Sequence, residues 1–252
     1  MPAHPPPATA GTPAALFADA FAADPARPLI IWYDDAISAR VELSVATMAN
    51  WVAKTGNLLQ DTVGASGGER LALALPPHWF APVFLLAGFC TGMVLDLDSL
   101  QGADVAAVGP DTVAAGVGAD AGELVVCGTA PLGGPCRGEL PDGALDFGAE
   151  APGHGDLLQP VSPVSADSTA LVAGGRTFTG AELVSAAAGR AAELELPSGA
   201  RVATSGNPAD PDGILDALLA PLAVGGSIVL IANPDPAARQ RRLTDERVTV
   251  EL

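Results

Sequence analysis

The sequence predicts an α/β fold of two similar units, with mostly parallel sheets flanked by helices. The first observation is that short apolar or β-branched runs alternate with segments of helical periodicity, which is the order of βα units. The second is an internal repeat, in which Arg70 and Pro77 recur at an equal offset as Arg201 and Pro208. Because strands and helices follow each other in the same order in both halves, we predict one shared topology with parallel strands.

The composition limits the class of protein. The chain has 252 residues and is 49% hydrophobic, which is enough for one large or two small domains with a sizeable core. Its 12 Lys and Arg residues against 29 Asp and Glu residues leave a net charge of −17. Such a surface repels nucleic acid and anionic membranes, so we expect neither as a partner. Three cysteines without a Cys-x-x-Cys pair, and no apolar run of membrane length, predict a cytoplasmic protein.

Glycine, proline and periodic segments divide the chain into four parts. We predict a disordered tail at 1–14, a first α/β unit at 15–99, a loop-rich connector at 100–165 and a second α/β unit at 166–252. Both units are expected to pack as one domain. The connector holds apolar runs at 105–108 and 124–127 that could add strands, whereas residues 128–163 lack periodicity and are expected to be poorly packed.

Hydrophobic spacing predicts the elements of the first unit. The expected order is a helix at 16–24, strands at 29–33 and 40–45, a helix at 46–63, a strand at 71–75, a helix at 80–91 and a strand at 93–97. In the second of these helices, Met48, Trp51 and Val52 share one apolar face and are expected to be buried. Lys54, the one lysine of the chain, is expected on the solvent side.

The second unit repeats this order. The expected elements are a strand at 169–172, a helix at 180–193, a strand at 201–204, a helix over 214–222, a strand at 227–231, a polar helix opened by Asp235 and Pro236, and a strand at 247–252. Thr179 and Glu182 have the spacing of a capping box. Pro221 is expected to kink or end its helix.

The candidate ligand site lies between the first strand of the second unit and the helix that follows it. Its residues are Gly174, Gly175, Arg176, Thr177 and Thr179. A strand, a glycine turn and a helix start can together present backbone N–H groups to a phosphate. A working phosphate loop, however, is longer and carries a Lys, which is absent here. The alternative is a β-turn followed by a helix cap, which we favour because glycine pairs and threonine caps are common.

His78 is a second candidate, because it follows a predicted strand end and could face a cleft as a general base. The alternative is an exposed loop histidine beside a helix start, which we favour because no second catalytic group is visible. The spacing of Cys127 and Cys136, and that of the aspartates near residue 98, fits no known metal site, so we expect no metal. We assign no cofactor, except that AMP or ATP could bind weakly at the glycine turn.

Two parts of the chain resemble the N-terminal region of the adenylate-forming superfamily, which comprises acyl-CoA synthetases, luciferases and adenylation domains. The first part contains LFADAFAADPARPLIIWYDD, VELSVATMANWVAKTGNLLQ and GERLALALPPHWFAPVFLLAGFCTGMVLDLD. The second is GARVATSGNPADPDGILDALLAPLAVGGSIVLIANPDPAARQRRLTDERVTVEL. The chain is most similar to a small actinobacterial family of truncated AMP-binding-like proteins, and the resemblance covers residues 15–99 and 166–252.

The departures from this superfamily guide the functional expectation. Its phosphate loop ends in Pro-Lys-Gly, where this chain has VAGGRTFTG, and its aromatic-His segment is replaced by SGNPADPDG. Its adenine-stacking motif, ribose-binding Asp, hinge and lid with a catalytic Lys would lie beyond Leu252. We therefore expect a truncated, degenerate, non-catalytic protein that binds a nucleotide or acyl ligand, or a protein partner such as a second copy. The alternative is an AMP-forming acyl-CoA synthetase or ligase, active alone or completed by another chain.

Overall fold

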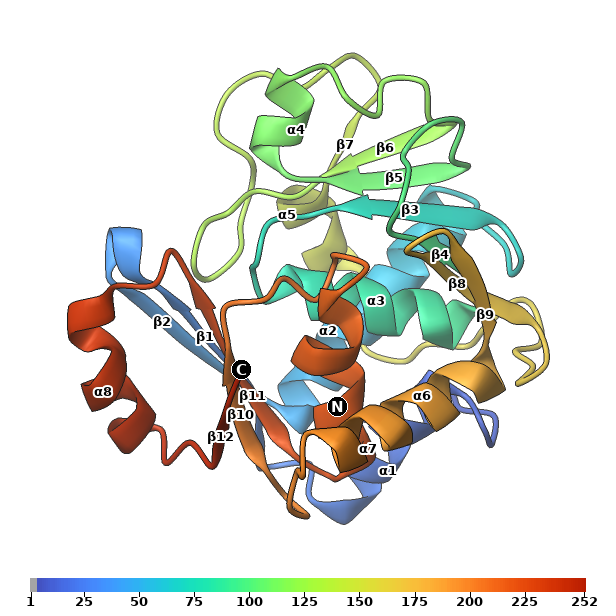
Figure 1. The fold of residues 1–252 in the computed structure, drawn as a ribbon. Helices are drawn as coiled ribbons and strands as arrows, with labels where there is room; N and C mark the ends of the chain where they lie inside the picture. Colours follow the sequence, from blue (N-terminus) through green and yellow to red (C-terminus); the bar gives the residue numbers. More distant parts are fainter. Residues whose placement is uncertain (1–3) are drawn as a thin grey trace.

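The computed structural model describes residues 4–252 and shows two β-sheets with helices packed between and around them (Figure 1). Sheet A has the order β12 (Val250–Glu251), β10 (Arg201–Thr204), β11 (Ser227–Ala232), β1 (Pro28–Asp34) and β2 (Ala39–Ser44). Sheet B has the order β7 (Leu145–Asp146), β6 (Glu123–Val126), β5 (Val105–Val108), β3 (Arg70–Ala74), β4 (Val94–Asp96), β8 (Thr169–Ala173) and β9 (Arg176–Thr179). This mixed architecture is the predicted fold class.

The α-helices are α1 (Pro13–Ala23), α2 (Val45–Asn57), α3 (Phe80–Thr91), α4 (Pro110–Ala114), α5 (Phe147–Glu150), α6 (Gly180–Glu193), α7 (Ala220–Ala223) and α8 (Pro236–Asp245). Short 3-10 turns lie at Asp35–Ile37 and Ala151–Gly153, and π-helical turns lie at Leu58–Thr62 and Leu215–Leu219. None of the helices in residues 4–252 has the length and apolar character needed to cross a bilayer.

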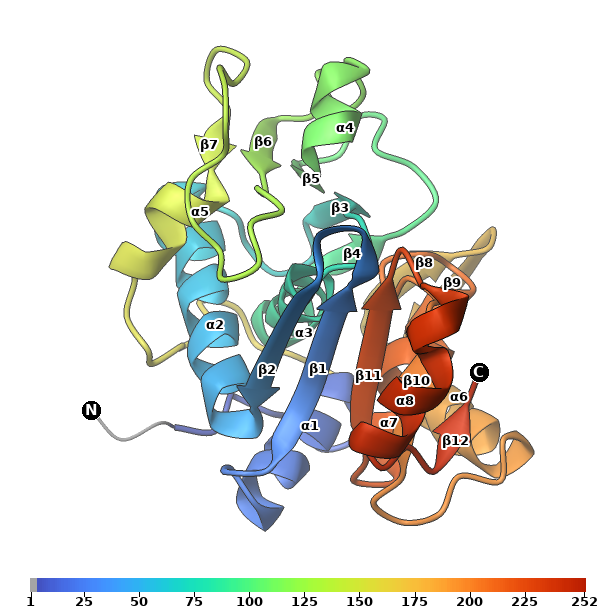
Figure 2. The same cartoon turned by 90° about the vertical axis from the view of Figure 1, so that its left-hand side faces the viewer.

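Each sheet combines strands from both halves of the chain. β3 lies parallel to β4, with Arg70 opposite Val94, and β10 lies parallel to β11, with Arg201 opposite Ser227. The repeated arginines therefore begin strand pairs that are equivalent in the two sheets. The hairpin β1–β2, however, adds to β11 of the second half, as Figure 2 shows, and the hairpin β8–β9 adds to β4 of the first half. The halves are thus repeats in sequence that exchange hairpins in space.

Helix α3 lies at the centre of the molecule, and all of its residues are buried. Its sequence FAPVFLLAGFCT is apolar on every side, as expected of a helix enclosed on all sides by other elements. A Cβ on Gly88 would lie 2.6 Å from Leu95 Cδ2, so glycine lets α3 approach β4 closely. The core around α3 also takes in Phe17 of α1, Trp32 of β1 and Leu218 of the turn before α7, so it joins both halves.

Two helix starts follow capping signals in the sequence. The Thr179 hydroxyl accepts the Glu182 N–H while the Glu182 carboxylate accepts the Thr179 N–H at 2.8 Å, which is the predicted capping box of α6. Ser44 caps α2 by accepting an N–H of its first turn. Pro221 lies within α7, directly after a π-helical turn, so the helix changes its hydrogen-bonding pattern beside a residue that cannot donate.

Ordered structure begins earlier than the predicted tail at 1–14 allows. Residues 1–3 of this tail lie outside the described part of the chain. Helix α1 begins at Pro13, and its cap Thr12 is buried. The Thr9 hydroxyl donates to a connector carbonyl at 2.8 Å. The boundary was missed because a proline at the first position of a helix also fits a proline-rich tail.

The connector between the halves is packed more closely than its composition suggests. β5 and β6 extend sheet B beside β3, and β7 continues it. Within 128–163, which was expected to be poorly packed, Phe147 and Ala151 are fully buried and Leu158 is 5% exposed. The expectation is therefore wrong for this part of the segment.

Polar side chains of α2 and the turn after it hold the connector in place. Lys54 Nζ donates to the His154 carbonyl at 2.5 Å and pairs with Asp156 at 3.1 Å. Asn57 and Gln60 donate to further connector carbonyls. Backbone carbonyls are present at every residue, so these contacts leave no hydrophobic pattern in the sequence. Lys54 is covered by the connector, with 21% of its side chain exposed, and the expectation that it lies on the solvent side is wrong.

We predict that Trp51→Ala lowers the free energy of unfolding by about 3 kcal/mol, because it empties an aromatic cluster. The Trp51 ring lies 5.2 to 6.2 Å from those of Trp79, Phe80 and Phe147. Urea denaturation measures the change. The matched control is Leu132→Ala, at a side chain 82% exposed, which should change stability by less than about 0.5 kcal/mol. A loss below about 1 kcal/mol for Trp51→Ala would show that this cluster does not support α2.

Candidate functional site

The predicted ligand site is the tip of the β8–β9 hairpin. Gly174 and Gly175 have φ values of +60° and +70°, so both are left-handed, as a two-residue type I′ hairpin turn requires. Thr177 then pairs with Val172 across the hairpin. The sequence predicted a strand, a glycine turn and a helix, whereas the structure inserts β9 before α6. The order was misjudged because β9 is four residues long and continues directly into the helix cap.

A carboxylate of the chain itself occupies the N–H groups of this turn. The N–H of Gly174 donates to Asp98 Oδ1 at 2.7 Å, and the N–H of Gly175 donates to Asp98 Oδ2 at 2.8 Å. Asp98 lies in the loop after β4, and its own N–H donates to the Asp96 carboxylate at 2.8 Å. The two donors that the sequence offers to a phosphate are therefore satisfied by a negative charge within the protein.

Arg176 is the cation of the predicted site, and it points along the hairpin. Its guanidinium lies 4.6 Å from the Phe178 ring centroid, and no ion pair to it is present among the described residues. Both side chains line a pocket of about 350 Å³ between the hairpin, α6 and residues 211–216. Arg190, on the same pocket, is held by Asp216 at 2.6 Å. Of these two guanidinium groups, that of Arg176 is the one available to a ligand.

The two threonines of the predicted site have structural partners. Thr177 belongs to the β9 ladder, and Thr179 is the cap of α6. Hydrogen bonds from the Thr179 backbone and hydroxyl, together with the nearby Arg176, lower the pKa of Glu182 in the capping box. These contacts match the structural alternative, a turn followed by a helix cap, for Thr179.

His78 is buried, so both expectations for it, a base that faces a cleft and an exposed loop histidine, are wrong. It is 3% exposed, and its ring lies 4.3 Å from that of Trp32 and 4.6 Å from that of Phe80. The Phe80 N–H donates to His78 Nδ1 at 3.3 Å, whereas Nε2 has no hydrogen-bond partner among the described residues. Burial lowers the pKa of His78 to about 3, although the Ala130 backbone opposes this shift. A neutral ring enclosed by aromatic side chains packs in the core and has no access to a substrate.

Asp98 is the site residue that sequence reasoning missed. The spacing of the aspartates near it fits no known metal site, so this spacing does not mark Asp98 as a site residue. The available signal was its position directly after a predicted parallel strand, at the edge where such strands present ligand-binding groups. Within residues 4–252, no three His, Cys, Asp or Glu side chains are grouped so that they could hold a metal ion.

The two-sheet α/β architecture is an acyl-CoA synthetase-like fold. The solved structure of an acyl-CoA synthetase from Brucella canis matches 95% of the chain with a TM-score of 0.76 at 17% sequence identity. The chain spans about half of that protein, 46% of its length. The predicted resemblance to an N-terminal region of this kind is thereby confirmed.

The family follows from sequence. A TIGR03089 family protein of Mycobacterium tuberculosis (strain ATCC 25618 / H37Rv) is 40% identical over 232 residues, which cover 90% of this chain and 92% of the relative. The chain therefore belongs to the TIGR03089 family. No family model matches it.

We predict that the burial of neutral His78 makes the protein less stable as the pH falls below 6.5. Its pKa falls from 6.5 to about 3 on folding, so below pH 6.5 the unfolded chain binds a proton that the folded chain does not. The free energy of unfolding should therefore fall by about 1.4 kcal/mol per pH unit as pH drops from 6.5 towards 3. Urea denaturation at several pH values should show this contribution in the wild type and in a His154→Gln control. Its persistence in His78→Gln would contradict the assignment.

Proposed function

We propose that this protein is a non-catalytic member of the acyl-CoA synthetase fold that acts as a binding and interaction protein. The observation that carries the proposal is the Asp98 carboxylate on the N–H groups of Gly174 and Gly175. A phosphate and a carboxylate cannot share these two donors, and the fixed negative charge repels a nucleotide.

The chemistry of adenylation argues in the same direction. A transferring phosphoryl group needs cations or fixed dipoles aimed at the charge that develops on it. Here the dipoles of the turn are occupied, and Arg176 stacks on Phe178 beside the pocket of about 350 Å³. Lys54, the one lysine, is bound to the connector at His154 and Asp156. Of these groups, Arg176 is the one cation left to face a reacting phosphate, and it lacks the fixed dipoles of the turn beside it.

The pocket beside Arg176 supports a residual role in binding small ligands. Its walls include Leu171, Phe178 and Leu183, and Arg176 offers a guanidinium to an anionic group. We therefore keep weak binding of an acyl ligand or of AMP as part of the proposal, secondary to interaction with a protein partner. The competing function is that of a ligase completed by another chain. Its support is that this chain spans 46% of the matched synthetase.

Pyrophosphate exchange separates these functions. Purified protein with Mg-ATP and a panel of carboxylic acids is expected to give no exchange above background, because no acyl-adenylate forms. Exchange that is clearly above background in the wild type and absent in Arg176→Ala would overturn the non-catalytic proposal. An active acyl-CoA synthetase assayed in parallel controls for the reagents.

We predict that removing the Asp98 carboxylate makes the hairpin tip receptive to anions. In Asp98→Ala, the N–H groups of Gly174 and Gly175 lose their acceptor and are free to donate. Inorganic phosphate at millimolar concentration should then shift the amide resonances of these two glycines. The wild type, and a Glu139→Ala control that removes the same charge elsewhere, should show no such shift. Equal shifts in all three proteins would show that Asp98 does not block the turn.

A further inference from the structure

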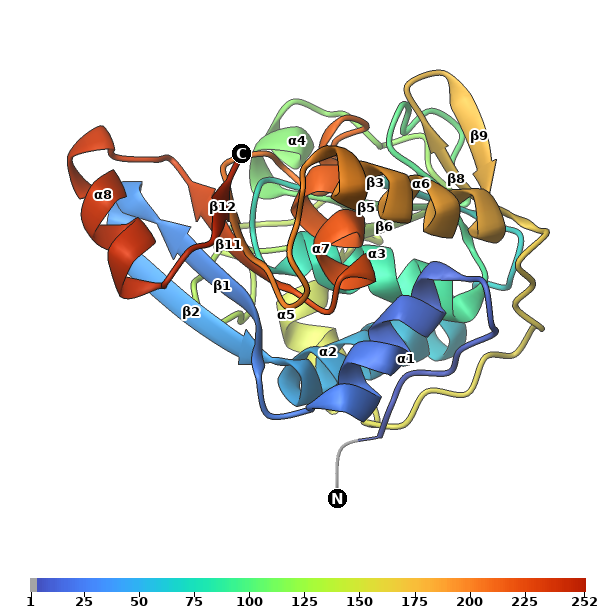
Figure 3. The ribbon, with the colours of Figure 1, turned by 60° about the horizontal axis from the view of Figure 1, so that its bottom comes forward.

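Strand β2 leaves one long side of sheet A open. It pairs with β1 on one side and ends the sheet on the other, and Figure 3 shows it at the margin of the sheet. Among the described residues, no strand or loop is hydrogen-bonded to its free side. β2 has six residues, whereas the other edge strands have four in β9 and two each in β7 and β12. An unpaired edge of this length is a template for a further strand.

The side chains of β2 alternate between the two faces of the sheet. Val41 and Leu43 are 6% exposed and belong to the core. Arg40 and Glu42 project from the opposite face, where their side chains are 43% and 42% exposed. They form an ion pair at 2.6 Å. β2 contains no proline, which would block an added strand, and the two charges on its exposed face, Arg40 and Glu42, are of opposite sign.

The charges of β2 are complementary to those of the same strand turned by a two-fold axis. Antiparallel pairing centred on Val41 places Arg40 of each copy opposite Glu42 of the other and Val41 opposite Val41. Centring on Arg40 or on Glu42 would place like charges opposite each other, which is destabilising. Centring between two residues would set exposed side chains against buried ones, because side-chain direction alternates along a strand. Of the registers centred in the middle of β2, the one centred on Val41 alone pairs opposite charges and keeps the buried side chains of both copies on the same face.

We propose that the free edge of β2 is a dimer interface whose occupant is a second copy of this chain. The two sheets A then join into one continuous sheet across the two-fold axis, by the strand addition that edge recognition uses elsewhere. Two cross-strand ion pairs between Arg40 and Glu42 fix the register. Dimerisation through β2 does not depend on whether the protein forms adenylates, so the two properties are tested separately.

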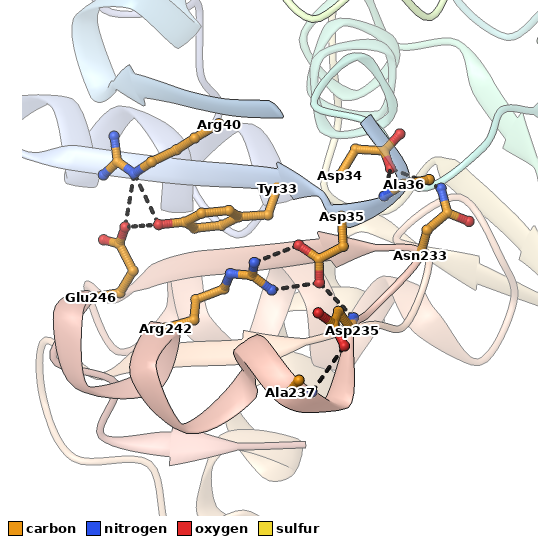
Figure 4. A network of polar contacts seen from close by, with 10 residues as sticks. All are labelled: Tyr33, Asp34, Asp35, Ala36, Arg40, Asn233, Asp235, Ala237, Arg242 and Glu246. Carbon is orange, nitrogen blue, oxygen red and sulfur yellow. Dashed lines mark hydrogen bonds and ion pairs between the residues drawn. The ribbon is translucent and has the colours of Figure 1, made fainter. Parts of the chain in front are cut away.

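Arg40 is positioned by Tyr33 of β1 and by Glu246, the residue directly after α8. Its Nε donates to Glu246 Oε1 at 2.9 Å and to the Tyr33 hydroxyl at 3.0 Å, and Tyr33 donates to Glu246 at 2.5 Å (Figure 4). Arg242 of α8 forms a second ion pair, with Asp35 at the tip of the β1–β2 hairpin. This network orders the guanidinium in the monomer, so less conformational entropy is lost when the partner's carboxylate approaches.

The expected dimer is weak, because a single six-residue strand contributes the contact and each copy carries a net charge of −17. Sedimentation analysis should therefore run from about 1 µM to about 1 mM protein. Salt near 0.15 M limits the long-range repulsion to about 8 Å while the paired strands remain in contact. A wild type that stays monomeric over the whole range would overturn the proposal.

Glu42→Arg is the decisive variant, because the polar partner of the Glu42 side chain within residues 4–252 is Arg40 alone and an exposed ion pair contributes little to stability. The substitution sets two arginines opposite each other across the interface and should raise the dimer dissociation constant by at least about tenfold. Glu139→Arg makes the same charge change in the connector, at an exposed residue, and should leave dimerisation unaltered. Equal dissociation constants for the wild type and Glu42→Arg would overturn the register.

A charge exchange tests the pairing itself. Arg40→Glu alone faces Glu42 of its partner and should be monomeric, whereas a mixture with Glu42→Arg restores opposite charges at both positions and should form heterodimers. Thermal melting checks that Arg40→Glu folds, since Arg40 also contacts Glu246. A folded pair that gives no heterodimer would contradict the proposal. If Arg40→Glu does not fold, the comparison of Glu42→Arg with Glu139→Arg decides the question alone.

Discussion

Hairpin exchange is the constraint on which the rest of this structure depends. β1 lies parallel to β11 and β8 lies parallel to β4, so each sheet is completed by the other half of the chain. Helix α3 is enclosed as a result, and its apolar sequence has no exposed side. Strand pairs between distant segments are slow to form, because loop closure must precede the contacts that stabilise it. The main hydrophobic core accordingly contains residues of both halves.

Local chemistry was readable from the sequence, and distant pairing was not. The capping box at Thr179 and Glu182, the strands around Arg70 and Arg201, and the mixed α/β class all follow from short-range patterns. The exchange of hairpins and the anchoring of the connector by Lys54 depend on which segments meet in space. A carbonyl oxygen that accepts a hydrogen bond has no identity in the sequence, so such contacts cannot be read from residue types.

The candidate site shows the same division. The glycine turn was recognised, and the preference for a turn and cap over a phosphate loop agrees with the two-residue hairpin at Gly174 and Gly175. The position of Asp98 after a predicted parallel strand is a signal for a ligand-binding group. Its contact with the hairpin is not readable from the sequence, because nothing local relates residue 98 to Gly174. The position of His78 after a predicted strand is compatible with a catalytic base. Its enclosure by Trp32 and Phe80 depends on segments that meet only in the folded chain.

The contact between Asp98 and the hairpin would make the binding of any anion at the hairpin tip a competition with a carboxylate of the same chain. Any anion that binds to Gly174 and Gly175 must displace Asp98. Its apparent affinity is therefore its intrinsic affinity multiplied by the fraction of molecules in which Asp98 has left the turn. Displacement would release the loop after β4, and the same free energy would couple loop opening to occupancy in both directions. An anion bound at Gly174 and Gly175 would thereby favour the open position of the loop that carries Asp98.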